Sequence, residues 1–215
     1  MSEPQEKEPS RARRPKLAAA FAALLLAAIA FGWFTFRNGP LAHPTPVAVV
    51  EQAAGRLEVS MGKDYWRQAF PGEGVPKGVL LRTAEGSNVS LRLTGGATVR
   101  IDGEGRVQFI GVDVVRLEQG DLRVDASGAQ PGSPPLEIRT PFGLIHDAGP
   151  RFEVRCFDSA VPPLLVLARE GSLAFDGAGR SYRVVAGEEL QMRHDGEVMR
   201  SRAEAAERPA GGLEP

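Results

Sequence analysis

The stretch that decides the fold is Val89-Ser90-Leu91-Arg92-Leu93-Thr94-Gly95-Gly96-Ala97-Thr98-Val99-Arg100-Ile101. Apolar and polar residues alternate in both halves of it, which is the pattern of a β-strand with one buried and one solvated face. The two glycines between the halves are typical turn residues. The stretch therefore predicts two short strands separated by a glycine turn.

The same pattern continues on both sides of this stretch. Further alternating runs lie at residues 106–109, 136–139, 151–155 and 182–185. Between Pro40 and Gly196 no stretch longer than 11 residues lacks both glycine and proline, whereas ordinary helices average about 11 to 12 residues. Turn signals recur roughly every 8 to 12 residues. The sequence thus predicts an all-β domain, an antiparallel sandwich or β-roll of roughly a dozen short strands.

Three segments resemble one another weakly within this domain. Each begins with glycine and has leucine and a further apolar residue at fixed offsets: Gly55–Ser60, Gly120–Asp125 and Gly171–Asp176. The spacings between them, 65 and 51 residues, are too irregular for a solenoid of fixed period. We interpret the segments as recurring units of one β domain, each a strand that leaves a glycine turn.

The N-terminal part contains a candidate membrane anchor. Leu17 to Phe36 are twenty residues without a charge, and as a helix they would span roughly 30 Å, the thickness of a bilayer's hydrocarbon core. Basic residues cluster before this segment and only Arg37 closely follows it, which places the N-terminus in the cytoplasm and the rest of the chain outside. A cleaved signal peptide ending near Ala28-Ile29-Ala30 is the alternative. Either interpretation predicts that the β domain is exported.

The composition divides the rest of the chain. Residues 1–16 are polar and predict a disordered cytoplasmic tail. Residues 37–50 are proline-rich at their start and predict an extended spacer. The β domain is expected over residues 51–200, and residues 201–215, rich in Ala, Glu, Gly and Pro, predict a second disordered tail.

Charge and cysteine content exclude several classes of protein. The 215 residues carry 26 Lys and Arg against 27 Asp and Glu, a formal charge of −1, so the chain offers no overall basic field for nucleic acid. The single cysteine excludes an intrachain disulfide and every multi-cysteine zinc pattern. The fold must therefore rest on its hydrophobic core.

Few residues are candidates for chemistry. Cys156 shares the apolar face of a strand with Phe152 and Val154, which favours a buried thiol. The alternative, a nucleophile, would need His146 and Asp147 as base and orienting group. The three histidines lack metal-ligand spacing, and the glycines fit neither a dinucleotide fingerprint nor a P-loop. We predict no catalytic residue, no metal and no cofactor, and the sequence identifies no small-molecule ligand.

Tyr65-Trp66-Arg67 is the candidate partner-binding segment. Tryptophan and arginine are the side chains that most often anchor protein interfaces. For Trp66 itself the sequence favours burial in the core over a place at an interface, because large aromatic side chains dominate core packing.

Four blocks of sequence, in this order, resemble the FecR-like family of periplasmic signal transducers. The resemblance covers about Gly55 to Glu197 and is carried by Gly55–Val59 with Trp66, by Gly78–Val99, by Val115–Val124 around Gly120, and by Ile138-Arg139-Thr140-Pro141-Phe142-Gly143 followed by Gly149–Val154, Gly171 and Gly187. It implies structural roles for the motif residues Gly120, Thr140, Pro141, Gly149, Phe152 and Gly171. Pro150 stands where family members usually have threonine and cannot donate a ladder hydrogen bond, so we expect strand pairing to be interrupted there.

The resemblance also implies a function. Family members carry a signal from an outer-membrane transporter to a cytoplasmic sigma factor, so this chain is expected to be a single-pass protein of the bacterial inner membrane with a non-enzymatic periplasmic domain. Better-known members have a folded sigma-binding region before the anchor, which sixteen residues cannot supply. We therefore expect sigma-factor control through a partner, an outer-membrane transporter or another membrane regulator. The alternative is an envelope scaffold or glycan-binding module without a signalling role.

Overall fold

A computed structural model describes residues 45–60, 62 and 65–202 of the chain. All regular elements in these residues are β-strands, so the predicted all-β class is confirmed. The predicted cytoplasmic tail, the transmembrane helix at 17–36 and most of the spacer lie outside the described residues. Within the residues that are described, no helix is long and apolar enough to cross a membrane.

The described part contains sixteen strands, more than the dozen expected. They are β1 (Pro46–Ala54), β2 (Leu57–Ser60), β3 (Trp66–Gln68), β4 (Gly74–Pro76), β5 (Leu80–Thr83), β6 (Asn88–Leu93), β7 (Thr98–Phe109), β8 (Val114–Asp125), β9 (Glu137–Thr140), β10 (Gly143–His146), β11 (Arg151–Cys156), β12 (Leu164–Glu170), β13 (Ser172–Gly177), β14 (Arg180–Val185), β15 (Glu188–Met192) and β16 (Val198–Arg202). The spacer predicted to reach residue 50 is therefore too long, because Val47, Ala48 and Val50 are buried and belong to β1.

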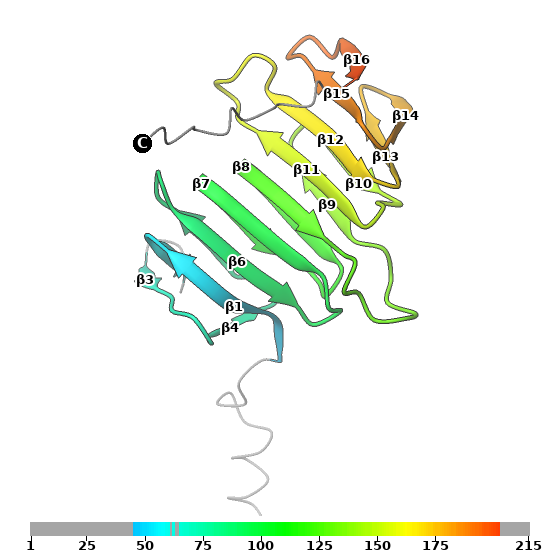
Figure 1. Cartoon of the computed structure of the whole chain (residues 1–215). Helices are drawn as coiled ribbons and strands as arrows, with labels where there is room; N and C mark the ends of the chain where they lie inside the picture. The colour runs from blue at the N-terminus through cyan, green and yellow to red at the C-terminus, as the bar shows by residue number, and fades with distance from the viewer. Residues whose placement is uncertain (1–44, 61, 63–64, 203–215) are drawn as a thin grey trace, which may run out of the picture. The chain divides into compact units, whose positions relative to one another are not determined.

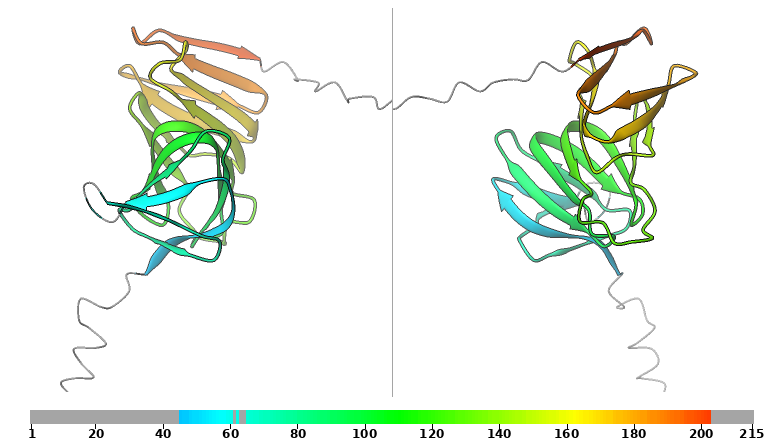
Figure 2. Two further views of the ribbon diagram at one scale, coloured as in Figure 1. Left: turned by 90° about the vertical axis from the view of Figure 1, so that its left-hand side faces the viewer. Right: turned by 45° about the vertical axis from the view of Figure 1, so that its right-hand side comes forward.

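All sixteen strands belong to one hydrogen-bonded sheet; fifteen of them form two layers, and the short β4 pairs with the start of β1. We call layer I the row β1-β6-β7-β8-β11-β12-β15-β16, at the front of Figure 1, and layer II the row β3-β2-β5-β7-β8-β9-β10-β13-β14. β7 and β8 occur in both rows because residues 98–102 and 121–125 pair within layer I, while residues 105–109 and 114–119 pair within layer II. The side views of Figure 2 show the layers facing each other. The pair β8–β9 is parallel, and the other described pairs are antiparallel.

Glycines make the bends of β7 and β8 possible. Gly103 has φ 72° and Gly120 has φ 126°, backbone conformations that side chains with a Cβ rarely adopt. A Cβ at Gly120 would lie 2.9 Å from Cα of Gly105 on the neighbouring strand, which is closer than two carbons can approach. The backbones of β7 and β8 can therefore bend side by side and approach this closely only because these positions carry no side chain.

The three similar sequence segments mark crossings between the layers. β1 of layer I is followed at Gly55 by β2 of layer II, β8 passes from layer II to layer I at Gly120, and β12 of layer I is followed at Gly171 by β13 of layer II. The expectation of a strand leaving a glycine turn is confirmed at Gly55 and Gly171, but it is wrong at Gly120, which lies inside β8 and bends the strand without ending it. Their spacing is irregular because the number of strands between crossings differs.

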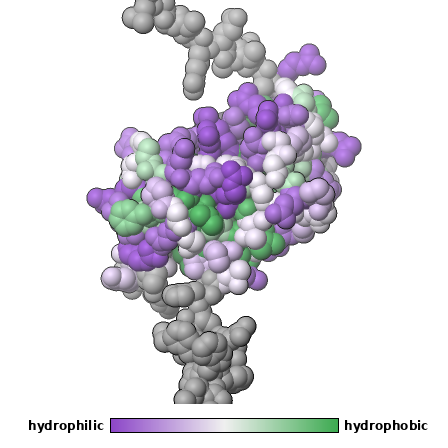
Figure 3. All heavy atoms as spheres, turned by 60° about the horizontal axis from the view of Figure 1, so that its bottom comes forward, coloured by the Kyte–Doolittle hydropathy of each residue, from purple (hydrophilic) through white to green (hydrophobic). Residues whose placement is uncertain are grey.

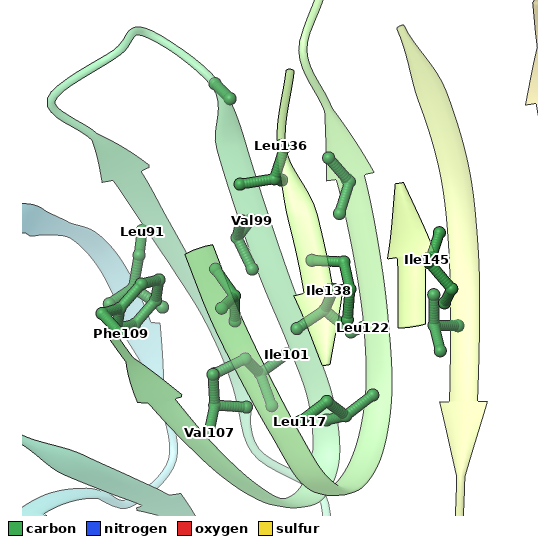
Figure 4. Close-up of a cluster of buried hydrophobic side chains, with 14 of the residues drawn as sticks. Leu91, Val99, Ile101, Val107, Phe109, Leu117, Leu122, Leu136, Ile138 and Ile145 are labelled. Carbon is green, nitrogen blue, oxygen red and sulfur yellow. The ribbon is translucent and has the colours of Figure 1, made fainter. Parts of the chain in front are cut away.

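The core lies between the layers and is built from the inward residues of both. Figure 4 shows a part of it around β7 and β8, where Leu91, Ile101 and Leu122 of layer I face Val107 and Ile138 of layer II. The largest fully buried side chains are aromatic or branched aliphatic, and Phe109, Phe152 and Phe175 lead them. This alternation of buried and exposed positions is what the opening sequence stretch predicted.

Candidate protein-binding site

The segment Tyr65-Trp66-Arg67 lies at the free edge of layer II. β3 pairs only with β2 among the described strands, so its other backbone edge carries no ladder. Tyr65 is 67% exposed and Phe70, just after the strand, is 58% exposed. Two exposed aromatic side chains beside an open strand edge are the arrangement expected of a protein contact.

Trp66 is held on the surface and does not enter the core, so the core interpretation is wrong. Its ring is half-buried and the guanidinium carbon of Arg82 lies 4.2 Å above the ring centre. Arg82 is itself fixed, since its Nε donates to Glu58 Oε2 at 2.6 Å. The cation–π contact and the ion pair orient Trp66 before any partner arrives.

Arg67 is engaged within the chain. Its guanidinium donates to the carboxylate of Glu73, and Glu73 also accepts from the backbone N–H of Phe70 at 3.3 Å. The hydrogen bond from Arg67 holds the pKa of Glu73 below its ordinary value, and the same bond raises the pKa of Arg67. Arg67 therefore shapes the loop at residues 70–73, and Tyr65 and Trp66 are left as the side chains that can meet a partner.

The family-motif residues Thr140, Pro141 and Phe152 stabilise the fold through a turn and through core packing. Thr140 Oγ1 accepts hydrogen bonds from the N–H groups of Phe142 and Gly143 and donates to the carbonyl of Gly143, which closes the two-residue turn between β9 and β10. Pro141 occupies the first turn position, where its fixed φ fits. Phe152 is 1% exposed and lies in the core.

Gly149 and Gly171 meet at a crossing between the layers. A Cβ at Gly149 would lie 2.6 Å from the carbonyl oxygen of Glu170 and 3.1 Å from Cα of Gly171. Pro150 follows, and β11 begins directly after it, with a register shift against β12 between Arg151 and Phe152. The expected interruption at Pro150 is thus confined to the start of β11, where the carbonyl of Pro150 accepts from Ala126 N–H at 2.7 Å.

The structure does not bring Cys156 and His146 together as a nucleophile and its base. Cys156 is fully buried in layer I, where its Sγ faces the carbonyl of Glu118 at 3.7 Å, and burial raises the pKa of its thiol to about 12. His146 lies in layer II, where Nε2 is 3.0 Å from Asp176 Oδ2 and Nδ1 is 3.1 Å from Asp147 Oδ2. A thiol with so high a pKa is neutral at physiological pH and is a poor nucleophile.

Two further surfaces were not found from the sequence. An apolar crevice of about 310 Å³ lies at the end of the domain, lined among others by Leu93, Val112, Ala129 and Leu136, and Figure 3 shows hydrophobic surface gathered in the middle of the face seen from this end. The outer face of layer I is hollowed by two adjoining cavities of about 600 and 620 Å³. Alternation along single strands gives the outward residues, but only the pairing of eight strands brings them onto one surface.

Comparison with protein families supports the resemblance noted in the sequence. Residues 79–173 match the family model described as FecR protein. These residues are a FecR domain. The matched segment runs from the residue before β5 to the start of β13 and so contains the bent strands β7 and β8, the Thr140 turn and the Gly149–Gly171 contact.

Two solved structures have a similar fold. Both are crystal structures of a proposed anti-sigma factor from Parabacteroides distasonis ATCC 8503, at 1.65 and 2.50 Å resolution, with TM-scores of 0.52 and 0.51 and sequence identities of 16% and 17%. The similarity covers 59% of this chain and 60% of each of those chains. At such identities the similarity shows a shared fold. No curated protein matches the chain.

Proposed function

We propose that this chain is a non-enzymatic regulatory protein of the bacterial cell envelope, whose β domain, which contains the FecR domain, binds another envelope protein and takes part in sigma-factor control through that partner. The FecR domain at residues 79–173 is the observation that carries the proposal. The fold shared with a proposed anti-sigma factor supports the same regulatory role.

In this proposal residues 17–36 anchor the protein in the inner membrane by a single pass, with the N-terminus in the cytoplasm and the β domain in the periplasm. The uncharged segment of twenty residues and the basic residues before it support this topology. The partner is an outer-membrane transporter or a second membrane regulator.

The β3 edge is the proposed contact for this partner. An extended segment of the partner can add to the free backbone edge of β3, which supplies main-chain hydrogen bonds. Tyr65 and the pre-oriented Trp66 would then supply aromatic contact area, which commonly dominates interface energetics. Arg82 keeps Trp66 in place during the encounter.

Photocrosslinking in living bacteria tests the proposal. A photoreactive residue is placed at Tyr65 of the full-length protein, and a matched control carries it at Val161, which is 84% exposed in the β11–β12 loop. We expect position 65 to capture a transporter or a second membrane regulator that position 161 does not capture.

Two results would contradict this function. Equal capture at both positions would show that the β3 edge has no special role. Capture of only peptidoglycan or structural envelope components at position 65 would instead support the scaffold or glycan-binding alternative.

A further inference from the structure

A row of outward side chains crosses the whole of layer I. Eight residues on eight neighbouring strands stand opposite one another in register: Gln52, Ser90, Arg100, Arg123, Glu153, Leu167, Glu189 and Ser201. All eight line the two adjoining cavities on the outer face, which share Arg123, Glu153 and Arg169. We call this continuous hollow the trough.

Most charges of the trough are paired within the chain. Glu51 lies 2.5 Å from Arg92, Asp125 lies 3.3 Å from Arg151, and Asp121 lies 2.6 Å from Arg155. Glu153 accepts two hydrogen bonds from Arg169, at 3.0 and 3.1 Å. These carboxylates are therefore largely neutralised by the arginines beside them.

Three charged side chains of the trough have no ion-pair partner among the described residues: Glu189 and Arg202 near β16, and Arg100 at the centre. Arg100 is exposed. Its direct cross-strand neighbour is another arginine, Arg123, and like charges in such a position destabilise a sheet. Arg123 has Asp102 at 3.0 Å and Glu153 at 4.0 Å, but nothing comparable serves Arg100. The pair thus leaves a place for one further anion, beside the hydroxyls of Ser90 and Thr98.

Apolar surface lies further along the same trough. Leu165 and Leu167 of β12 point outward and line the cavity next to Arg155 and Arg169. Leu167 is only 5% exposed, as expected where long arginine side chains lie over an apolar surface. Displacing these arginines would cost little, because their ion pairs with Asp121 and Glu153 are solvent-exposed and such pairs contribute little stability.

The distance between the unpaired Arg100 and the apolar surface at Leu167 indicates which kind of ligand fits the trough. Arg100 and Leu167 are separated by three strand-to-strand steps, on β7, β8, β11 and β12, which amounts to roughly 14 Å at about 4.8 Å per step. An extended peptide advances about 3.4 Å per residue, so residues four apart on one face are also roughly 14 Å apart. A carboxylate on Arg100 and an aliphatic side chain on Leu167 would thus be four residues apart in such a peptide.

We propose that the trough of layer I binds an extended acidic segment of a partner protein, with a Glu or Asp on Arg100 and an aliphatic residue four positions away over Leu165 and Leu167. This site lies on layer I and is separate from the β3 edge, which belongs to layer II. It therefore does not depend on the function proposed for that edge. Because the site combines an unpaired cation, Arg100, with an apolar surface at Leu165 and Leu167, it favours a peptide with acidic and aliphatic side chains over a purely anionic polymer.

Fluorescence polarisation with designed peptides tests the site on the full-length protein. Labelled peptides of nine residues carry one Glu and one Leu, two to six positions apart in a Ser/Thr background, and a control replaces Glu by Gln. We expect the spacing of four to bind best, with at least a tenfold loss in Arg100→Gln and in the Gln peptide. Arg183→Gln, which removes an exposed arginine of β14 in layer II, is expected to leave binding unchanged.

Several outcomes would overturn the site. Equal binding of all spacings, or no loss in Arg100→Gln, would show that Arg100 does not recognise a carboxylate in register with Leu167. Polygalacturonate competing as well as the best peptide would indicate an anionic glycan. A chain ending at Arg202 that binds the peptide tenfold more tightly would indicate that residues 203–215 occupy the trough. A lower melting temperature of Arg100→Gln would make Arg100 a structural residue, since removal of like charge should leave stability unchanged or higher.

Discussion

At the scale of single residues, the layer crossing at Gly120 is the most demanding position. Gly120→Ala would add left-handed strain, which costs about 1 to 3 kcal/mol, and would also place a Cβ 2.9 Å from Cα of Gly105. Gly78→Ala is the matched control, because its φ of 84° imposes similar strain while nothing lies within 4 Å of the added carbon. Urea unfolding should show a clearly larger loss for Gly120→Ala, and equal losses would mean that the close approach is unimportant.

Cys156 is expected to link stability to alkaline pH. Its pKa rises from 9.0 to about 12 on folding, so the thiol is neutral in both states below pH 9 and has no effect there. Between pH 9 and 12 only the unfolded thiol ionises, which lowers the free energy of unfolding by about 1.4 kcal/mol per pH unit. Comparison of wild type with Cys156→Ala by urea unfolding across this range isolates the effect. Parallel pH profiles of the two proteins would show that the thiol is not perturbed.

At the scale of elements, the turn between β9 and β10 depends on one hydroxyl group. Thr140→Val keeps the shape of the side chain but removes the acceptor for two backbone N–H groups and the donor to Gly143. A loss of about 1 to 3 kcal/mol is expected, the cost of leaving such groups without partners. Thr140→Ser retains the hydroxyl and should retain most of the stability in thermal unfolding. Similar losses in the two variants would point to the methyl group instead.

The strands themselves were largely predictable from the sequence, but their joining was not. Alternation located the strands around Leu91, Val99 and Phe152, because one face of each is buried in the core. The alternating runs up to Ile101 and from residue 106 were expected to be separate strands, and Gly120 was expected to lie in a turn, yet β7 and β8 are each one continuous strand of 12 residues that passes through Gly103 and Gly120. Local sequence cannot distinguish a turn from a bend, since the difference depends on which distant strands supply the next hydrogen bonds.

The candidate sites, too, were predictable from the sequence only where they depend on local residues and not on strand pairing. The exposed aromatic residue Tyr65 belongs to a local motif, so the sequence could single it out. The position of Trp66 under Arg82 depends on the pairing of β2 with β5, which places Glu58 beside Arg82. Arg100 and Leu167 lie on strands far apart in the sequence, and their shared row follows only from three successive registers.

At the scale of the whole molecule, β8 joins two halves of the β domain, the strands before it and the strands after it. The chain passes between the layers at one end of layer I in the first half and at the opposite end in the second. In the first half, β1 to β8, the chain passes between the layers near Gly120. In the second half, the connections β10–β11 and β12–β13 pass between the layers near Gly149 and Gly171. These two glycines lie next to the cross-strand pair Arg151–Asp125, at the C-terminal end of β8. β8 pairs with β7 of the first half and with β9 and β11 of the second. Neither half can keep its layer order without this strand.

The shared strand leads us to expect a single unfolding transition for residues 45–202. Hydrogen exchange of the full-length protein in rising urea should give the same midpoint for peptides from β5–β7 and from β12–β15. Leu122→Ala, at a buried position of β8, should lower both midpoints together by an amount equivalent to about 2 to 5 kcal/mol. If β12–β15 lost protection first, or if Leu122→Ala affected only one half, the halves would be separate folding units, because a common core strand requires both to unfold with it.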